Sequence, residues 1–126
     1  MPRILLVTNK RESLETLARA LNAEASVTLE WAHERKDAQN RVRDWRPDLM
    51  VVDEYVGYLT NFEFIRQIMA FNTRICTAAV SRLPRESFHD MTDGLGRVAQ
   101  LPPGAGMLEA ERLLALLETV DPANES

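Results

Sequence analysis

The feature that most constrains the fold is a pair of short, uninterrupted apolar runs, Ile4–Val7 and Leu49–Val52. Neither run alternates with polar residues, as a strand with one wet face would. An uninterrupted apolar strand is typical of a parallel sheet, which is buried on both faces by helices. The sequence therefore predicts an α/β fold built around a parallel sheet.

The spacing of the other apolar residues predicts three further strands and five helices. The further strands are predicted at 27–31, 75–80 and 98–101. Apolar residues recur at helical spacing in five segments, at 14–21, 38–45, 62–69, 88–95 and 113–120. Strands that alternate with helices form a doubly wound five-stranded parallel sheet with helices on both faces. One domain, residues 1–121, accounts for this pattern, and a polar tail follows at 122–126.

Composition excludes several classes of protein. With 126 residues, 45% apolar and 27% charged, the chain has the make-up of one globular domain. A net charge of −4 argues against a nucleic-acid surface, and a single cysteine, Cys76, excludes an internal disulfide. Neither a signal peptide nor a membrane span of roughly 18 apolar residues is present. We therefore expect a cytoplasmic protein that contacts neither nucleic acid nor membrane.

Asp53, directly after the second apolar run, is the candidate functional residue. Ligand sites in doubly wound sheets lie beyond the carboxyl ends of the strands. The candidate pocket residues at those ends are Thr8, Asn9, Asp53, Glu54, Ser81 and Leu101. Two interpretations of Asp53 remain open. It is either a reactive carboxylate or a polar residue that ends a strand and caps the following loop.

Three segments together resemble the receiver domain of two-component response regulators, the CheY-like superfamily. They are "RILLV" at the start, "RPDLMVVDEYV" in the middle and "NFEFIRQI" after it, with Pro102 beyond the last predicted strand. The resemblance covers nearly the whole chain and implies a flavodoxin-like sheet with strand order 2-1-3-4-5. It also implies that Asp53 is the phosphoacceptor position and that the backbone carbonyl of Tyr55 is a Mg²⁺ ligand.

Several functional positions of that family carry other residues in this chain. The acidic pair after the first strand is replaced by Thr8 and Asn9, and the lysine before the last proline by Leu101. Phosphoryl transfer needs metal and cationic groups around the phosphoryl oxygens. With only Asn9, Asp53 and the Tyr55 carbonyl as metal ligands, we expect no resident cofactor and only weak Mg²⁺ binding. Phosphorylation of Asp53 is accordingly expected to be weak or lost.

The fourth and fifth strands carry two further departures from the family. The position of the family's Thr or Ser falls on either Ala79 or Ser81, and the aromatic switch residue is replaced by Val98. Without that aromatic ring, the usual coupling from a phosphate to the partner surface is broken. The residues expected on that surface are Phe88, Met91, Leu95 and Val98.

The resulting prediction is an atypical, non-enzymatic pseudo-receiver of two-component phosphorelay signalling that acts through protein contact. Its partner would be a sensor kinase, an effector or a second copy of the chain. One alternative is a conventional single-domain response regulator phosphorylated at Asp53. The second is a small flavodoxin-like ligand-binding protein or enzyme, for which the sequence shows no nucleophile–base pair, Gly-rich phosphate loop or metal cluster.

Overall fold

A five-stranded parallel sheet forms the centre of the protein in the computed structural model, which describes residues 2–24, 26–72 and 74–119. Its strands are β1 (Arg3–Val7), β2 (Thr28–Ala32), β3 (Leu49–Val52), β6 (Cys76–Val80) and β7 (Val98–Leu101). Their order is β2-β1-β3-β6-β7, which is the predicted 2-1-3-4-5 when only these strands are counted. The predicted fold class is therefore confirmed. The predicted tail at 122–126 lies outside the described residues.

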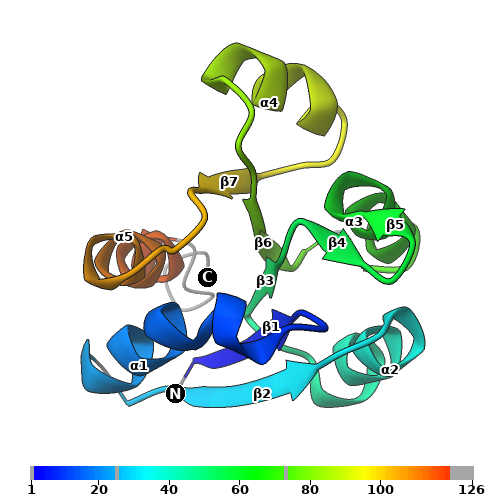
Figure 1. Cartoon of the computed structure of the whole chain (residues 1–126). Coiled ribbons are helices and arrows are strands. Elements are labelled where there is room, and N and C mark those ends of the chain that lie inside the picture. Colours follow the sequence, from blue (N-terminus) through cyan, green and yellow to red (C-terminus); the bar gives the residue numbers. More distant parts are fainter. Residues whose placement is uncertain (1, 25, 73, 120–126) are drawn as a thin grey trace.

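Helices cover both faces of the sheet (Figure 1). On one face lie α1 (Glu15–Glu24), which follows a short 3-10 turn, and α5 (Met107–Thr119). On the other face lie α2 (Arg35–Trp45), α3 (Asn61–Met69) and α4 (Arg85–Thr92). No helix in the described part of the chain is long and apolar enough to span a membrane.

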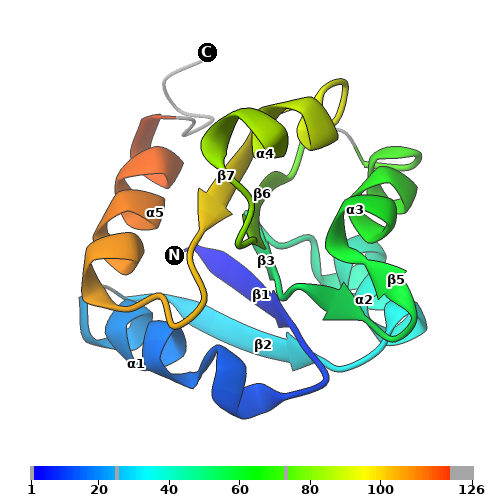
Figure 2. The same cartoon turned by 45° about the horizontal axis from the view of Figure 1, so that its top comes forward.

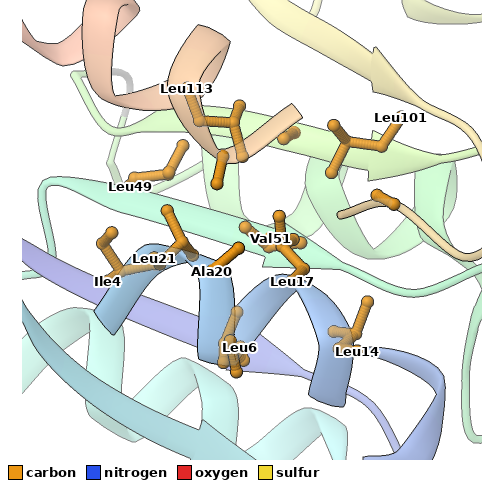
Figure 3. Close-up of a cluster of buried hydrophobic side chains, with 14 of the residues drawn as sticks. Ile4, Leu6, Leu14, Leu17, Ala20, Leu21, Leu49, Val51, Leu101 and Leu113 are labelled. Atoms are coloured by element: carbon orange, nitrogen blue, oxygen red, sulfur yellow. The ribbon is translucent and has the colours of Figure 1, made fainter. Parts of the chain in front are cut away.

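The strand β1 divides its side chains between two hydrophobic clusters. Ile4 and Leu6 belong to the cluster beneath α1 and α5, where Ile4 lies beside Leu21 of α1 (Figure 3). Leu5 and Val7 belong to the cluster beneath α2, α3 and α4. All four strand side chains are fully buried, which explains why the run in the sequence is apolar at every position.

The structure differs from the sequence-based prediction in two loops. Helix α4 ends at Thr92, so Leu95, which was expected within the helix, lies in the turn beyond it and is buried there. Gly94 in this turn has a φ of 82°, a left-handed conformation that a helix cannot continue through. The loop after β3 contains an antiparallel hairpin of β4 (Tyr55–Val56) and β5 (Leu59–Thr60).

Candidate functional site

Four side chains form a row across the carboxyl end of the sheet. Val80 and Leu101 are partners in the β6–β7 register. The β1–β3 and β3–β6 registers, extended by one residue, bring Thr8 and Asp53 into the same row. Side chains in one row of a parallel sheet point to the same face, and here that face is the one covered by α1 and α5. From β1 to β7, the row therefore consists of the Thr8 hydroxyl, the Asp53 carboxylate and the aliphatic side chains of Val80 and Leu101.

Both oxygens of the Asp53 carboxylate accept hydrogen bonds from the chain itself. The Thr8 hydroxyl donates to Oδ2 at 2.6 Å, and the backbone N–H of Glu54 donates to Oδ1 at 2.9 Å. The first distance is that of a charge-assisted bond. Thr8 is held in turn because its hydroxyl accepts from the Lys10 N–H at 3.0 Å, and its side chain is buried. Asp53 therefore caps the start of its own loop.

The donor set around Asp53 fits Mg²⁺ poorly. Of the three predicted ligands, Asn9 and the Tyr55 carbonyl are neutral, and Asn9 is exposed beyond β1. Within the described residues, His, Cys, Asp and Glu side chains nowhere gather in threes that could hold a metal. A Mg²⁺ ion requires hard oxygen ligands in near-octahedral geometry. Here the predicted ligands supply a single carboxylate, and each of its oxygens already accepts one hydrogen bond.

The structure places Val80, and neither of the two residues considered from sequence, level with Asp53. Ala79 belongs to the opposite hydrophobic cluster. The Ser81 hydroxyl is engaged locally, where it accepts from the Leu83 N–H at 3.1 Å. The one polar residue of the run 75–80 is Thr77, which lies on the same face as Ala79 because side chains alternate along a strand. No polar residue of the run therefore marks the side chains that face Asp53.

Glu54, the residue after Asp53, lies outside this row. It forms an ion pair with Arg82, with 3.3 Å between Glu54 Oε1 and Arg82 Nε. The side chains are 32% and 73% exposed, and an exposed pair of this kind contributes about 0–1 kcal/mol. Sequence analysis did not single out Arg82. Its contact with Glu54 joins loops 28 residues apart, and no local pattern signals such a contact.

Asn61 is a second structural residue that sequence analysis missed. Its side chain is 2% exposed, and Nδ2 donates to the carbonyl of Val80 at 2.8 Å. Its backbone N–H donates to the carbonyl of Glu54 at 3.1 Å. The same helix start carries a capping box between Thr60 and Glu63. The first turn of α3 is therefore fixed both to the end of β6 and to the loop beside Asp53.

The hairpin beside Asp53 carries two exposed aromatic residues. Gly57 has a φ of 62° at the first central position of the turn, where a two-residue hairpin loop commonly needs a glycine. Tyr58 follows and is fully exposed, and Tyr55 is largely exposed. The hairpin therefore presents two aromatic side chains on the surface.

The four residues predicted for the partner surface divide into two groups. Phe88 and Leu95 are buried, at 3% and 4% exposure, and Phe88 packs edge-on against Phe62 with 5.7 Å between ring centroids. Met91 is exposed, and Val98 is half-buried. The first pair therefore belongs to the core, and only the second pair reaches the surface of this face.

A groove of about 920 Å³ lies on the same face. We call it the β7 groove. It runs between α4, β7 and the N-terminal half of α5, and its lining includes Arg82, Arg85, Phe88, Val98, Gln100 and Arg112. In the views of Figures 1 and 2 the ribbon of β7 passes between α4 and α5. The groove is therefore assembled from the last third of the sequence.

No protein-family model matches the chain, and no match is found among curated proteins. Solved structures do resemble it. A two-component response regulator from Clostridium difficile is 10% identical, with a TM-score of 0.81 over 97% of this chain and 99% of that one. The non-phosphorylated HemR receiver domain from Leptospira biflexa is 23% identical, with a TM-score of 0.74 and coverage of 93% and 94%. Chemotaxis protein CheY4 from Vibrio cholerae is 18% identical, with a TM-score of 0.76 and coverage of 95% and 98%.

These solved structures span nearly all of the chain, and they include the receiver domain to which the sequence segments pointed. At such identities the likeness concerns the fold. The strand order and the distribution of helices over the two faces agree with that likeness. The chain has the receiver-domain fold of CheY-like response regulators.

Proposed function

We propose that the protein is a receiver-like module of two-component signalling that works by protein contact, with phosphorylation of Asp53 weak or lost. Its partner is a sensor kinase, an effector or a second copy, and it has no enzymatic activity of its own. The fold supports the signalling class, because the solved structures that resemble the chain include response regulators and a receiver domain. Fold alone does not give the activity, so the residues around Asp53 carry the finer claim.

The observation that carries this proposal is the row Thr8, Asp53, Val80 and Leu101. A phosphoryl group on Asp53 would bring negative charge into a site whose β6 and β7 neighbours are aliphatic and buried. Stabilising that charge requires a metal, a cation or hydrogen-bond donors aimed at the oxygens. Thr8 is the one polar neighbour in the row, and its hydroxyl lies within hydrogen-bond distance of the Asp53 carboxylate and of the Lys10 carbonyl, at 2.6 and 3.0 Å.

The β7 strand supports the same conclusion. Val98 is half-buried at the position where the resemblance implies an aromatic switch. An aliphatic side chain of this size has no ring to move between buried and exposed positions. The surface around β7 is therefore proposed to bind its partner without waiting for a covalent change at Asp53.

Intact-mass measurement after incubation with Mg²⁺ and a small phosphodonor, acetyl phosphate, tests the proposal. We expect at most a trace of singly phosphorylated protein, and the same trace for Asp53→Asn as the background. A stoichiometric gain of one phosphoryl group that Asp53→Asn abolishes would show that the conventional response-regulator alternative is correct.

A further inference from the structure

The β7 groove concentrates positive charge on a protein that is acidic as a whole. Arg82, Arg85 and Arg112 line it, while the chain has 19 acidic against 15 basic residues. Within the described residues, no Asp or Glu lines the groove. In the same part of the chain, Arg85 and Arg112 form no ion pair, and Arg82 pairs only with the half-buried Glu54. Arg85 and Arg112 are thus available to an acidic ligand.

The groove also contains the open edge of the sheet. β7 is the last strand of the sheet, with β6 on one side only. The Ser81 N–H donates to the Leu101 carbonyl at 2.9 Å, so the backbone groups of Leu101 face β6. In a strand the backbone groups of alternate residues point to opposite edges. The N–H and C=O groups of Val98 and Gln100 therefore point away from the sheet, and both residues line the groove.

Apolar surface lies between these polar groups. Val98, Pro102 and Leu83 contribute to the lining, and Leu83 is 38% exposed. Phe88 lies beneath this surface, with only 3% of its own area exposed. Unpaired strand edges are binding surfaces for extended peptides, in which main-chain hydrogen bonds give affinity and the flanking side chains give specificity. Here the flanking side chains are arginines and apolar residues.

We propose that the β7 groove binds an extended acidic segment of a partner protein, which adds to the sheet as a strand beside β7. Carboxylates of the segment pair with Arg85 from the α4 side and with Arg112 from the α5 side. Its apolar residues contact Leu83 and Val98. This inference rests on the proposed contact function and names the chemistry of the partner.

A second copy of the chain fits the groove less well. A two-fold symmetric dimer places the same patch of both subunits face to face. Across this groove it would bring Arg82, Arg85 and Arg112 of one copy close to the same residues of the other, and like charges brought together oppose association. An acidic segment supplies opposite charge and main-chain partners together.

Fluorescence polarisation with a labelled octapeptide, glutamate-glutamate-valine-valine repeated twice, tests the proposal on the full chain. The paired repeat presents glutamate and valine on both faces of an extended strand. We expect saturable binding that weakens as salt is raised, and none of the peptide in which lysine replaces glutamate. Two further peptides carry methyl groups on the backbone nitrogens, one at the odd and the other at the even residues. N-methylation removes main-chain donors and leaves the side-chain charges unchanged, so these peptides separate strand addition from charge attraction. One of the two should fail to bind.

Charge reversal in the groove provides the matched variant. Arg85→Glu with Arg112→Glu should weaken binding roughly tenfold or more. Arg66→Glu with Arg74→Glu, an equal change of charge on exposed arginines of α3 and the loop before β6, should leave binding within about twofold. Equal loss in both double variants, no binding of the acidic peptide, or tight binding of both N-methylated probes would overturn the proposal. The proposal would also be overturned if sedimentation showed a dimer in the absence of peptide and Arg85→Glu with Arg112→Glu dissociated that dimer.

The same titration with Asp53→Asn keeps the two proposals distinct. Equal affinity in both proteins supports the groove and the phosphorylation-independent contact. Binding that appears only after phosphorylation of Asp53 would leave the groove correct and overturn the proposed function. If neither the native protein nor Asp53→Asn binds the peptide, only the groove proposal is overturned, because the intact-mass measurement of phosphorylation does not depend on peptide binding.

Discussion

The Asp53 row and the β7 groove share the sheet and differ in how their polar groups are satisfied. At Asp53 each carboxylate oxygen already has a donor from the chain, and the neighbours on β6 and β7 are buried hydrocarbon. In the groove, Arg85 and Arg112 have no acidic partner among the described residues. A site whose polar groups are internally satisfied contributes to stability, whereas unsatisfied groups at a surface are available for binding. This difference is the basis for proposing that the chain binds its partner at β7.

The comparison predicts the largest effect where a charge is forced into the satisfied region. Leu101→Lys should destabilise the protein by about 3 kcal/mol, because it places an ammonium at a position that is 3% exposed. Leu101→Met, of similar volume, should cost less than about 1.5 kcal/mol. Urea unfolding measures both.

A double-mutant cycle sharpens that prediction. Asp53→Asn combined with Leu101→Lys should cost about 1 kcal/mol more than the two single changes together, because the new cation loses a carboxylate in its row. Strict additivity would show that a lysine at position 101 does not reach Asp53 past Val80, which lies between them in the row.

A middle-sized effect is expected at Thr8. Thr8→Val should cost about 2 kcal/mol, because it keeps the shape and removes the hydroxyl that donates to Asp53 Oδ2. Thr8→Ser retains the hydroxyl and should recover most of the loss. If the valine and serine variants unfold at the same urea concentration as the native protein, the hydrogen bond at 2.6 Å is not what holds Asp53.

The smallest effects are expected in the groove. Arg112→Ala and Arg85→Ala should each change the free energy of unfolding by less than about 0.5 kcal/mol, because exposed side chains without partners stabilise little. Thermal unfolding at low and high salt measures this. A loss as large as that of Thr8→Val would mean that the arginines hold the fold, and the contrast between the two regions would fail.

Sequence was sufficient for the elements whose apolar residues repeat locally. The runs at 4–7 and 49–52 predicted buried strands because both faces of those strands are covered. The place of Asp53 at the carboxyl end of β3 followed from the same pattern. Leu95 was misassigned because an apolar residue at helical spacing can equally be buried by a turn, and Gly94 provides that turn.

Which residues surround Asp53 could not be predicted, because their contacts join segments that are far apart in the sequence. Val80 was missed because the strand register that sets it level with Asp53 is a property of three paired strands. Arg82 and Asn61 were missed because their partners lie 28 and 19 residues away. The β7 groove combines residues from 81 to 112, so it exists only once α4 and α5 stand on either side of β7.

The two hydrogen bonds to Asp53 also bear on how such a module would carry information. A phosphorylated regulator changes its output in time, since the covalent mark is added and removed at constant protein level. A carboxylate whose oxygens are both occupied by the chain's own donors favours a single conformation at every moment. Occupancy of the partner would then follow mass action alone. We expect the cell to adjust the signal through synthesis and degradation of the protein, on the timescale of growth.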